Sequence, residues 1–250
     1  MIKAMIKNLR IKHSLIIFSV AIITVLVLIF LYGVQIETYK IIEIFLIMLF
    51  YSFYSFSLNN YFDRNVDRNN PLKIKFNPIA SGELSEQSSL FLNAFLVSSV
   101  LLMTFFWFSN TVLIMILAIL AVSLYSYKMK QKPIWDIVFH GLSFLTYFIF
   151  PAILFNLKPD LLIIGSLITL STSNMIEIGN QLEDFESDIK SNIITTAGKF
   201  GKKISKQICL ISAILFISSL IFLYISFNAP LILVFLISPL YKLYNMRNNF

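Results

Sequence analysis

Residues 51–67 read YSFYSFSLNNYFDRNVD, an apolar helix pattern that runs without a break into a polar, acidic end. The stretch from 41 to 60 is mostly apolar and has the roughly 20 residues that a bilayer crossing requires. Ser52, Ser55 and Asn59 recur every three or four residues and so share one helix face. A polar stripe in a membrane helix normally faces protein or water instead of lipid. This stretch therefore predicts a membrane helix whose polar face leads to a functional end.

The rest of the chain repeats this apolar character. Of its 250 residues, 58% are hydrophobic and only 13% are charged, and the mean hydropathy is +0.81. A soluble domain carries about 25% charged residues, so a soluble fold is excluded. One cysteine, Cys209, rules out an intramolecular disulfide. We predict eight membrane helices, at about 14–33, 41–60, 88–108, 110–127, 134–156, 160–180, 205–227 and 229–246.

The basic residues predict the orientation of these helices. With eight spans, all of the 20 Lys and Arg residues except Lys40 and Lys158 fall on one side of the membrane. By the positive-inside rule, both termini and the two long connections, 61–87 and 181–204, are then cytoplasmic. The net charge of +7 is explained by contact with lipid headgroups, and we expect no nucleic-acid partner.

A second acidic end, NQLEDFESD at 180–188, matches the first in spacing. Like charges four residues apart repel each other, and the helix macrodipole disfavours anions at a C-terminus. A bound Mg²⁺ removes both objections, because it takes one or two carboxylates and completes its shell with water and phosphate oxygens. The predicted metal ligands are Asn59, Asn60, Asp63, Asp67, Gln181, Asp184 and Asp188, and the four aspartates are also the predicted catalytic residues.

Basic and polar residues near these ends are candidates for binding substrate. The candidates for binding a diphosphate are Arg64, Arg68, Lys73, Lys75, Lys128 and Lys130; the alternative is that they only touch lipid headgroups. The candidates for contacting an acceptor are Tyr125, Asp136, His140, Asn174 and Glu177. Asp136 and His140, four residues apart, could orient or deprotonate an acceptor or could form an interfacial pair without chemistry.

Three segments together resemble the UbiA superfamily of intramembrane prenyltransferases. They are NNYFDRNVDRNNPLKIKFNPIASGELS (59–85), LYSYKMKQKP (124–133) and QLEDFESDIKSNIITTAGKFG (181–201). The resemblance implies a single all-α membrane domain over 1–250, with about eight helices around a central cavity. It also implies two Mg²⁺ ions that hold an isoprenyl diphosphate. The sequence departs from the family pattern at Asn60 and Gln181, where the family usually has Asp, and at Asn77, near a common Arg.

The resemblance implies transfer of an isoprenyl group from a polyprenyl diphosphate to a lipophilic or membrane-associated acceptor. That acceptor would be an aromatic or quinone precursor, or a glycerol-phosphate ether lipid. The alternatives are a related terpene cyclase, a non-catalytic isoprenoid-binding paralogue and a cation transporter. The matched acidic ends also suggest an internal duplication, about 14–127 and 134–246. The sequence does not fix the acceptor, the prenyl chain length or the oligomeric state.

Overall fold

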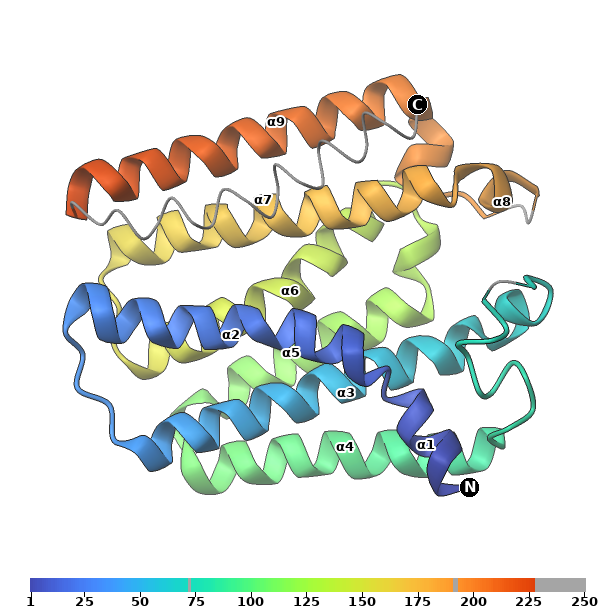
Figure 1. Cartoon of the computed structure of the whole chain (residues 1–250), viewed down its shortest axis with the longest axis horizontal. Coiled ribbons are helices and arrows are strands. Elements are labelled where there is room, and N and C mark those ends of the chain that lie inside the picture. Colours follow the sequence, from blue (N-terminus) through green and yellow to red (C-terminus); the bar gives the residue numbers. More distant parts are fainter. Residues whose placement is uncertain (72, 191–192, 228–250) are drawn as a thin grey trace. The chain divides into compact units, whose positions relative to one another are not determined.

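The computed structural model describes residues 1–71, 73–190 and 193–227, and every regular element in these residues is a helix (Figure 1). The longer helices are α2 (Ile11–Tyr32), α3 (Thr38–Arg68), α4 (Glu86–Trp107), α5 (Val112–Tyr127), α6 (Trp135–Leu154), α7 (Pro159–Glu183) and α9 (Thr196–Phe227). Two short α-helices, α1 (Ile2–Asn8) and α8 (Phe185–Lys190), and two 3₁₀ turns, η1 (Ser109–Thr111) and η2 (Met129–Gln131), complete the described chain.

Seven of these helices are long and apolar enough to cross a membrane, and they correspond in order to the first seven predicted spans. The eighth predicted span, 229–246, lies outside the described residues. The largest boundary differences are in α9, which begins at Thr196 and not at 205, and in α3, which continues to Arg68 and so includes the whole first acidic end in the helix. Ser85 is the N-cap of α4, a position that serine favours, and its hydroxyl accepts a hydrogen bond from the Ser88 amide at 3.1 Å.

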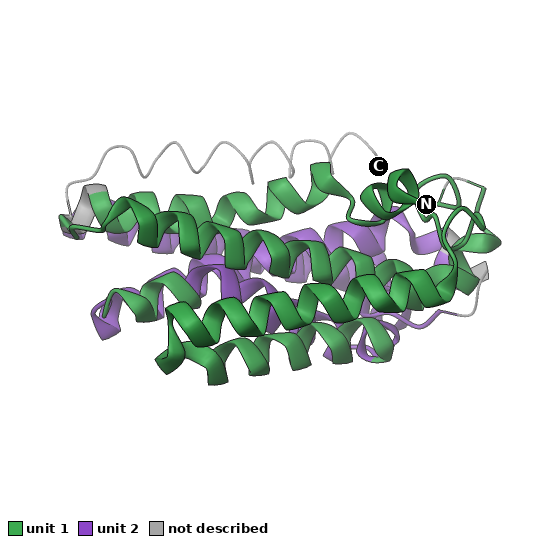
Figure 2. Ribbon diagram, turned by 90° about the horizontal axis from the view of Figure 1, so that it is seen from below, with its two compact units in different colours: residues 1–128, 150–156 green, residues 129–149, 157–250 purple. Residues whose placement is uncertain are grey.

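The chain divides into two compact units, coloured separately in Figure 2. Unit 1 comprises residues 1–128 and 150–156, and unit 2 comprises 129–149 and 157–250. The first acidic end belongs to unit 1 and the second to unit 2, so each is described within its own unit. The internal duplication stays a prediction.

In unit 1, α3 is the central helix and packs against α2, α4 and α5. Its fully buried face carries Ile44, Ile47, Met48 and Tyr51. The Tyr51 hydroxyl donates to the Ala118 carbonyl of α5 at 3.3 Å. Burial of each large apolar side chain stabilises the unit by about 1.5–3 kcal/mol where the alternative is water. This packing fixes the position of the polar end of α3 within unit 1.

In unit 2, α7 packs along α9. α6 approaches α7 closely at Gly165, where a Cβ atom would overlap the Phe148 ring. At Gly201 the backbone adopts φ 81° and ψ 163°, which interrupts α9 near its start. The first turn of α9, from Thr196, is therefore set at an angle to the long membrane helix and can return toward the ends of α6 and α7.

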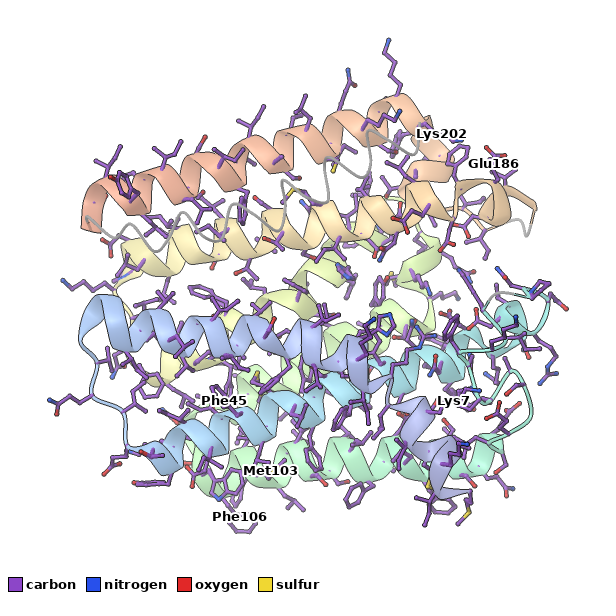
Figure 3. All side chains as sticks on the ribbon, viewed as in Figure 1. Lys7, Phe45, Met103, Phe106, Glu186 and Lys202 are labelled. Carbon is purple, nitrogen blue, oxygen red and sulfur yellow. The ribbon has the colours of Figure 1, made fainter. Side chains whose placement is uncertain are left out.

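Large apolar side chains also cover the outer faces of the helices. On α4, Phe91, Phe95 and Phe106 are more than half exposed, and Figure 3 shows Phe106 pointing away from the neighbouring helices. Such a surface would be unfavourable in water and suits lipid tails. Together with the seven apolar helices, it identifies an integral membrane protein.

Candidate active site

The first acidic end occupies the last turns of α3. Asp63 is half-buried and Asp67 is 4% exposed. Asn77, from the connection that follows α3, donates one amide to Asp67 Oδ2 at 2.9 Å and to the Asn60 carbonyl at 2.8 Å. These bonds fix the Asp67 carboxylate against the connection, because an amide donor stabilises a buried carboxylate.

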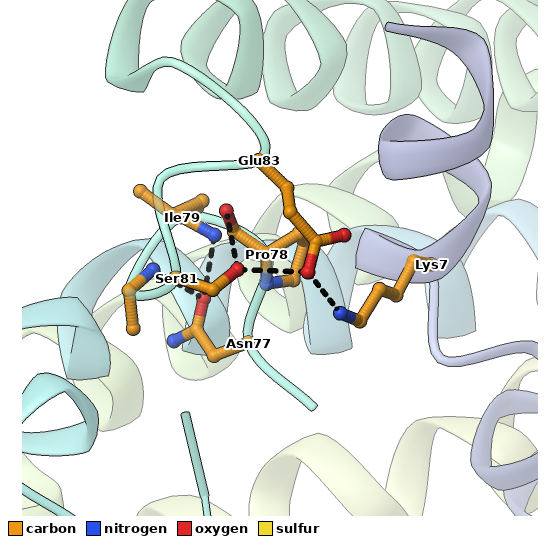
Figure 4. A network of polar contacts seen from close by, with 7 residues as sticks. Lys7, Asn77, Pro78, Ile79, Ser81 and Glu83 are labelled. Atoms are coloured by element: carbon orange, nitrogen blue, oxygen red, sulfur yellow. Dashed lines mark hydrogen bonds and ion pairs between the residues drawn. The ribbon is translucent and has the colours of Figure 1, made fainter. Parts of the chain in front are cut away.

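Asn77 also shapes the connection itself. Its Oδ1 accepts the backbone N–H groups of Ile79 and Ala80, at 3.1 and 3.3 Å, which makes a local turn (Figure 4). All polar atoms of the Asn77 side chain thus serve one purpose: they hold the chain after α3 in place beside Asp67.

The N-terminal helix α1 packs on the same connection. Ala4 joins Ile79 and Leu84 in a small buried cluster. At the rim, Lys7 Nζ lies 2.6 Å from Glu83 Oε1, and the Ser81 hydroxyl donates to the same oxygen at 3.1 Å (Figure 4). These contacts cover one side of the acidic end of α3 in unit 1.

Asn60, a predicted metal ligand, is fully buried and turned toward α1. Its Nδ2 donates to the Asn8 carbonyl at 3.1 Å and to Asn8 Oδ1 at 3.0 Å. Asn8 in turn donates to the Ser57 hydroxyl at 2.7 Å. The Asn60 amide nitrogen therefore joins α1 to α3, while its Oδ1 is buried without a hydrogen-bond partner among the described residues, so Asn60 stays a predicted metal ligand.

Arg10 is a candidate that sequence reasoning missed, because a basic residue before an apolar helix normally signals only orientation. It lies between α1 and α2 with a left-handed backbone, φ 44°. Burial lowers the pKa of its guanidinium, while the neighbouring carboxylates of Asp67 and Asp63 act in the opposite direction. Its Nε is buried without a hydrogen-bond partner among the described residues. A strained backbone with an incompletely bonded cation is typical of functional positions.

The other predicted diphosphate-binding residues differ in how far they are already engaged. Arg64 stacks on the Tyr61 ring, 4.4 Å from its centroid, and its Nε lies 2.9 Å from Glu86 Oε1. Arg68 is exposed at the last turn of α3. The remaining four lie in connections: Lys73 and Lys75 after α3, Lys128 at the end of α5, and Lys130 in η2.

The second acidic end lies where α7 passes into α8. Asp184 is the C-cap of α7, with φ −86° and ψ 0°, and the Asp188 amide donates to the Asp184 carbonyl at 2.9 Å. The helical turn therefore continues across the junction and preserves the four-residue spacing of the two acids. Asp184 is half-buried, and Asp188 is 9% exposed.

Gln181, another amide among the predicted metal ligands, has both of its polar atoms in hydrogen bonds. Its Nε2 donates to Asp136 Oδ2 and to Glu177 Oε1, both at 3.0 Å, and its Oε1 accepts the Ala197 amide at 3.0 Å. It thereby links α6, α7 and α9, and we do not propose it as a metal ligand.

Asp136 completes this arrangement and is fully buried at the start of α6. It accepts both the backbone amide, at 2.6 Å, and the hydroxyl of Thr196, the first residue of α9. The Thr196 hydroxyl also accepts the Ile134 amide at 2.7 Å. These bonds hold the two ends of the connection 184–196, so Asp136 positions the segment that carries the acids. No bond between Asp136 and His140 is found in the structure.

His140 instead faces α7, one turn further along α6. Its Nδ1 lies 2.6 Å from the Ser173 hydroxyl, and its Nε2 lies 3.7 Å from Glu177 Oε2. Glu177 is 5% exposed and sits two helical turns before Asp184. Asn174, also on α7, and Tyr125, on α5 of unit 1, are half-buried. Their predicted contact with an acceptor stays a prediction.

The carboxylate ends suit a metal that needs few protein ligands. Within the described part of either unit, no three His, Cys, Asp or Glu side chains gather closely enough to hold an ion. Each end offers two aspartates one turn apart, with hard oxygen donors. Mg²⁺ fits such a donor set, because it commonly takes one or two carboxylates together with water and substrate phosphates, whereas zinc needs three or four protein ligands.

Several solved structures share this fold at low sequence identity. A UbiA homologue from Archaeoglobus fulgidus, solved with DMAPP and Mg²⁺, is 16% identical, with a TM-score of 0.75 over 96% of this chain and 85% of the other. A digeranylgeranylglyceryl phosphate synthase structure is 22% identical, with a TM-score of 0.69 over 90% and 77%. A UbiA homologue from Aeropyrum pernix is 15% identical, with a TM-score of 0.73 over 88% and 81%.

Sequence comparison gives the family directly. No curated protein matches the chain in sequence. The model of the UbiA prenyltransferase family, however, matches residues 19–249, which is nearly the whole chain and includes both acidic ends. The family resemblance of the acidic segments and the membrane helix bundle predicted from it are thereby confirmed. This chain belongs to the UbiA prenyltransferase family.

Proposed function

We propose that the protein is a Mg²⁺-dependent intramembrane prenyltransferase that moves an isoprenyl group from a polyprenyl diphosphate to a lipophilic or membrane-associated acceptor. The observation that carries the proposal is the pair of buried aspartates, Asp67 and Asp188, at the polar ends of two membrane helices in a UbiA chain. Two aspartates one turn apart at a helix C-terminus suit a bound cation, because the cation offsets both their mutual repulsion and the macrodipole. The Archaeoglobus homologue, solved with DMAPP and Mg²⁺, supports the same reading.

The two acidic ends are proposed to serve one diphosphate on the cytoplasmic side. Asp63 and Asp67 of α3, with Asp184 and Asp188 of the α7–α8 junction, would hold the metal. The distribution of Lys and Arg supports a cytoplasmic position for both ends and for the termini. Asn59, on the helix face of Asp63, stays a predicted ligand, and two ions stay the predicted number.

The chemistry follows from the charge of the leaving group. When bound, Mg²⁺ would offset the negative charge that develops on the departing diphosphate. Arg10, beside Asp63 and Asp67, is proposed to contact the same diphosphate, and the lysines of the connections would add positive charge. The apolar helix faces would keep water from the allylic cation, so that the acceptor captures it.

The test is transfer of a labelled prenyl group by the purified protein to a native lipid extract, with and without chelator. We expect a labelled lipid that disappears when the metal is removed. Asp63→Ala and Asp184→Ala should each reduce transfer to below about 1% of wild type, because each removes charge stabilisation of the transition state. Asp160→Ala, at the opposite end of α7, is the matched control and should leave transfer unchanged.

The same assay separates the competing functions. A hydrocarbon or alcohol product without acceptor would indicate a cyclase, and tight binding of the diphosphate without product would indicate a non-catalytic paralogue. Metal flux into liposomes that prenyl diphosphate does not affect would indicate a transporter. If Asp63→Ala and Asp184→Ala both retained transfer, the proposed metal role would be wrong. The acceptor would be identified from the labelled lipid.

A further inference from the structure

His140 and Glu177 face each other inside unit 2, His140 from α6 and Glu177 from α7. Both lie within helices long and apolar enough to cross a membrane; Glu177 is 5% exposed and His140 is partly buried. Ionisable groups at such positions are costly and are usually kept for function.

The geometry is that of an oriented base. Ser173 lies 2.6 Å from His140 Nδ1 and can fix the ring tautomer, which leaves Nε2 as the nitrogen that takes up a proton. Glu177 Oε2 lies 3.7 Å from Nε2, beyond a direct hydrogen bond but close enough to stabilise a charged imidazole. The Phe144 ring stacks on the imidazole at 6.1 Å and limits its rotation. The His140 side chain remains 19% exposed, so a substrate atom can reach it.

The Glu177 carboxylate is itself held in place. Gln181 Nε2 donates to its Oε1 at 3.0 Å, which leaves Oε2 directed at His140. Glu177, from α7, faces the imidazole, and Asp136 lies one turn earlier on α6. Asp136 is bonded to Thr196 at the start of α9, so Glu177 is the carboxylate placed to balance a proton on His140.

The position along α7 relates this base to the proposed metal site. Glu177, Gln181, Asp184 and Asp188 follow one helix face, and at 1.5 Å per residue Glu177 lies about 10 Å deeper than Asp184. A diphosphate held at Asp184 would extend its prenyl chain in this direction. The carbon that is attacked, next to the diphosphate, then falls between the acids and the histidine.

We propose that His140 is the base that removes the proton from the acceptor, with Glu177 and Ser173 as positioning residues; this proposal rests on the prenyltransferase function above. It identifies the acceptor as one whose nucleophilic atom carries a proton, such as a hydroxyl group. For a hydroxyl acceptor, the bond from carbon to the diphosphate oxygen breaks and its electron pair leaves with the diphosphate. The hydroxyl oxygen forms the new bond to carbon, and its proton moves to His140 Nε2.

The test measures transfer and prenyl diphosphate binding separately, in His140→Ala and Glu177→Gln. We expect His140→Ala to lower kcat by about 10²- to 10⁴-fold, the usual contribution of a general base, with little change in KM for the prenyl diphosphate. In wild type, kcat/KM should decrease at acidic pH as the base becomes protonated, and in His140→Ala this decrease should be absent. Added imidazole should restore part of the rate of the variant. Glu177→Gln keeps the shape of the side chain and should lower kcat less. His13→Gln, the other histidine, is the matched control and should match wild type.

The outcomes separate the two proposals. If wild type transfers prenyl groups and His140→Ala keeps the same kcat and pH profile, the base assignment is overturned and the prenyltransferase remains. A KM increase without loss of kcat would assign His140 to binding and would also overturn it. If wild type binds prenyl diphosphate without transfer, both proposals fail together. Loss of prenyl diphosphate binding would indicate that His140→Ala does not fold. In that case Glu177→Gln and Ser173→Ala test the proposal, because an unchanged kcat in both variants would contradict an oriented base.

Discussion

The two acidic ends share a sequence pattern but are held in place differently. At the end of α3, the Asp67 carboxylate is bonded directly by a side chain, Asn77, from the connection that follows. At the end of α7, the anchoring bonds lie one turn earlier, at Gln181, and join that helix to the starts of α6 and α9. The first end is therefore held by a hydrogen bond to its own carboxylate, and the second by the bonds of Gln181 one turn before its carboxylates.

One feature is common to both ends: an amide stands where the family usually has an aspartate. Asn60 and Gln181 each occupy a buried position where the amide nitrogen faces two oxygen atoms. A carboxylate can only accept hydrogen bonds, whereas an amide also donates them. At both positions the amide nitrogen forms bonds to another helix that a carboxylate could not donate.

Gln181→Glu should have the largest effect on stability. It would place a third carboxylate beside Asp136 and Glu177, neither of which can donate unless it is protonated. The Ala197 amide would remain as a donor, but the added charge would face two carboxylates, and an uncompensated buried charge costs about 3–5 kcal/mol, so we expect the variant to unfold at a clearly lower temperature. The measurement is the reaction of Cys209, the single and buried cysteine, with a fluorogenic maleimide during heating.

Asn180→Asp is the control for this variant, because it adds the same charge at the exposed neighbouring position. It should unfold close to the wild-type temperature. Equal unfolding temperatures for Gln181→Glu and wild type would show that the Gln181 bonds do not hold unit 2 together.

Asn60→Asp should have a smaller effect. The new carboxylate would face the Asn8 carbonyl and Asn8 Oδ1, but the Asn8 amide can turn over and donate to it, whereas both groups that face the Gln181 amide nitrogen are carboxylates. The expected cost is about 1–3 kcal/mol for the unsatisfied backbone oxygen, seen as faster hydrogen exchange in α1. Asn65→Asp, exposed on the same helix, should exchange like wild type. Unchanged exchange in Asn60→Asp would contradict the link between α1 and α3.

The smallest effect is expected at the rim of the first end, where Lys7 contacts Glu83 (Figure 4). Hydrogen bonds from Lys7 and Ser81 lower the pKa of the exposed Glu83 carboxyl from its ordinary value of 4.5. The contact therefore stabilises α1 above that value and is lost as the pH falls through the lowered pKa. Lys7→Ala should speed hydrogen exchange in α1 slightly near neutral pH and not in acid.

The pair of Lys202 and Glu186, which belongs to unit 2, provides the comparison (Figure 3). Lys202→Ala should leave exchange in α1 unchanged at either pH. A loss of α1 protection that persisted in acid for Lys7→Ala would show that the lysine acts through packing and not through the carboxylate.

Much of the fold could be predicted because membrane helices are encoded locally. Runs of about 20 apolar residues located seven helices, most of them within a few residues of their observed bounds. The end of α3 was placed too early, since NNYFDRNVD is polar and hydropathy stops at Asn60, although the helix continues to Arg68. Polar residues mark where the apolar part of a helix ends, but the helix itself continues as long as its backbone hydrogen bonds are satisfied.

The site was only partly predictable. The four-residue repeat located Asp63, Asp67, Asp184 and Asp188, because neighbours on a helix face follow from spacing alone. The partners of Asn60 and Gln181 could not be predicted, and neither could the position of Arg10 beside the first acids. Asp136 illustrates the reason: its partner Thr196 is 60 residues away and is brought to it only by the packing of α6, α7 and α9.

The sequence by itself determined the membrane class, the helices and the spacing of the acids, since each depends on residues within one or two helical turns. Only the tertiary structure decided which polar side chains became bonds between helices and which remained available to a substrate. The physical reason is that a buried amide or carboxylate is governed by its nearest donors and acceptors, and in this protein those come from other helices. The same repeat therefore contains Gln181, which holds three helices, and Glu177, which faces a histidine.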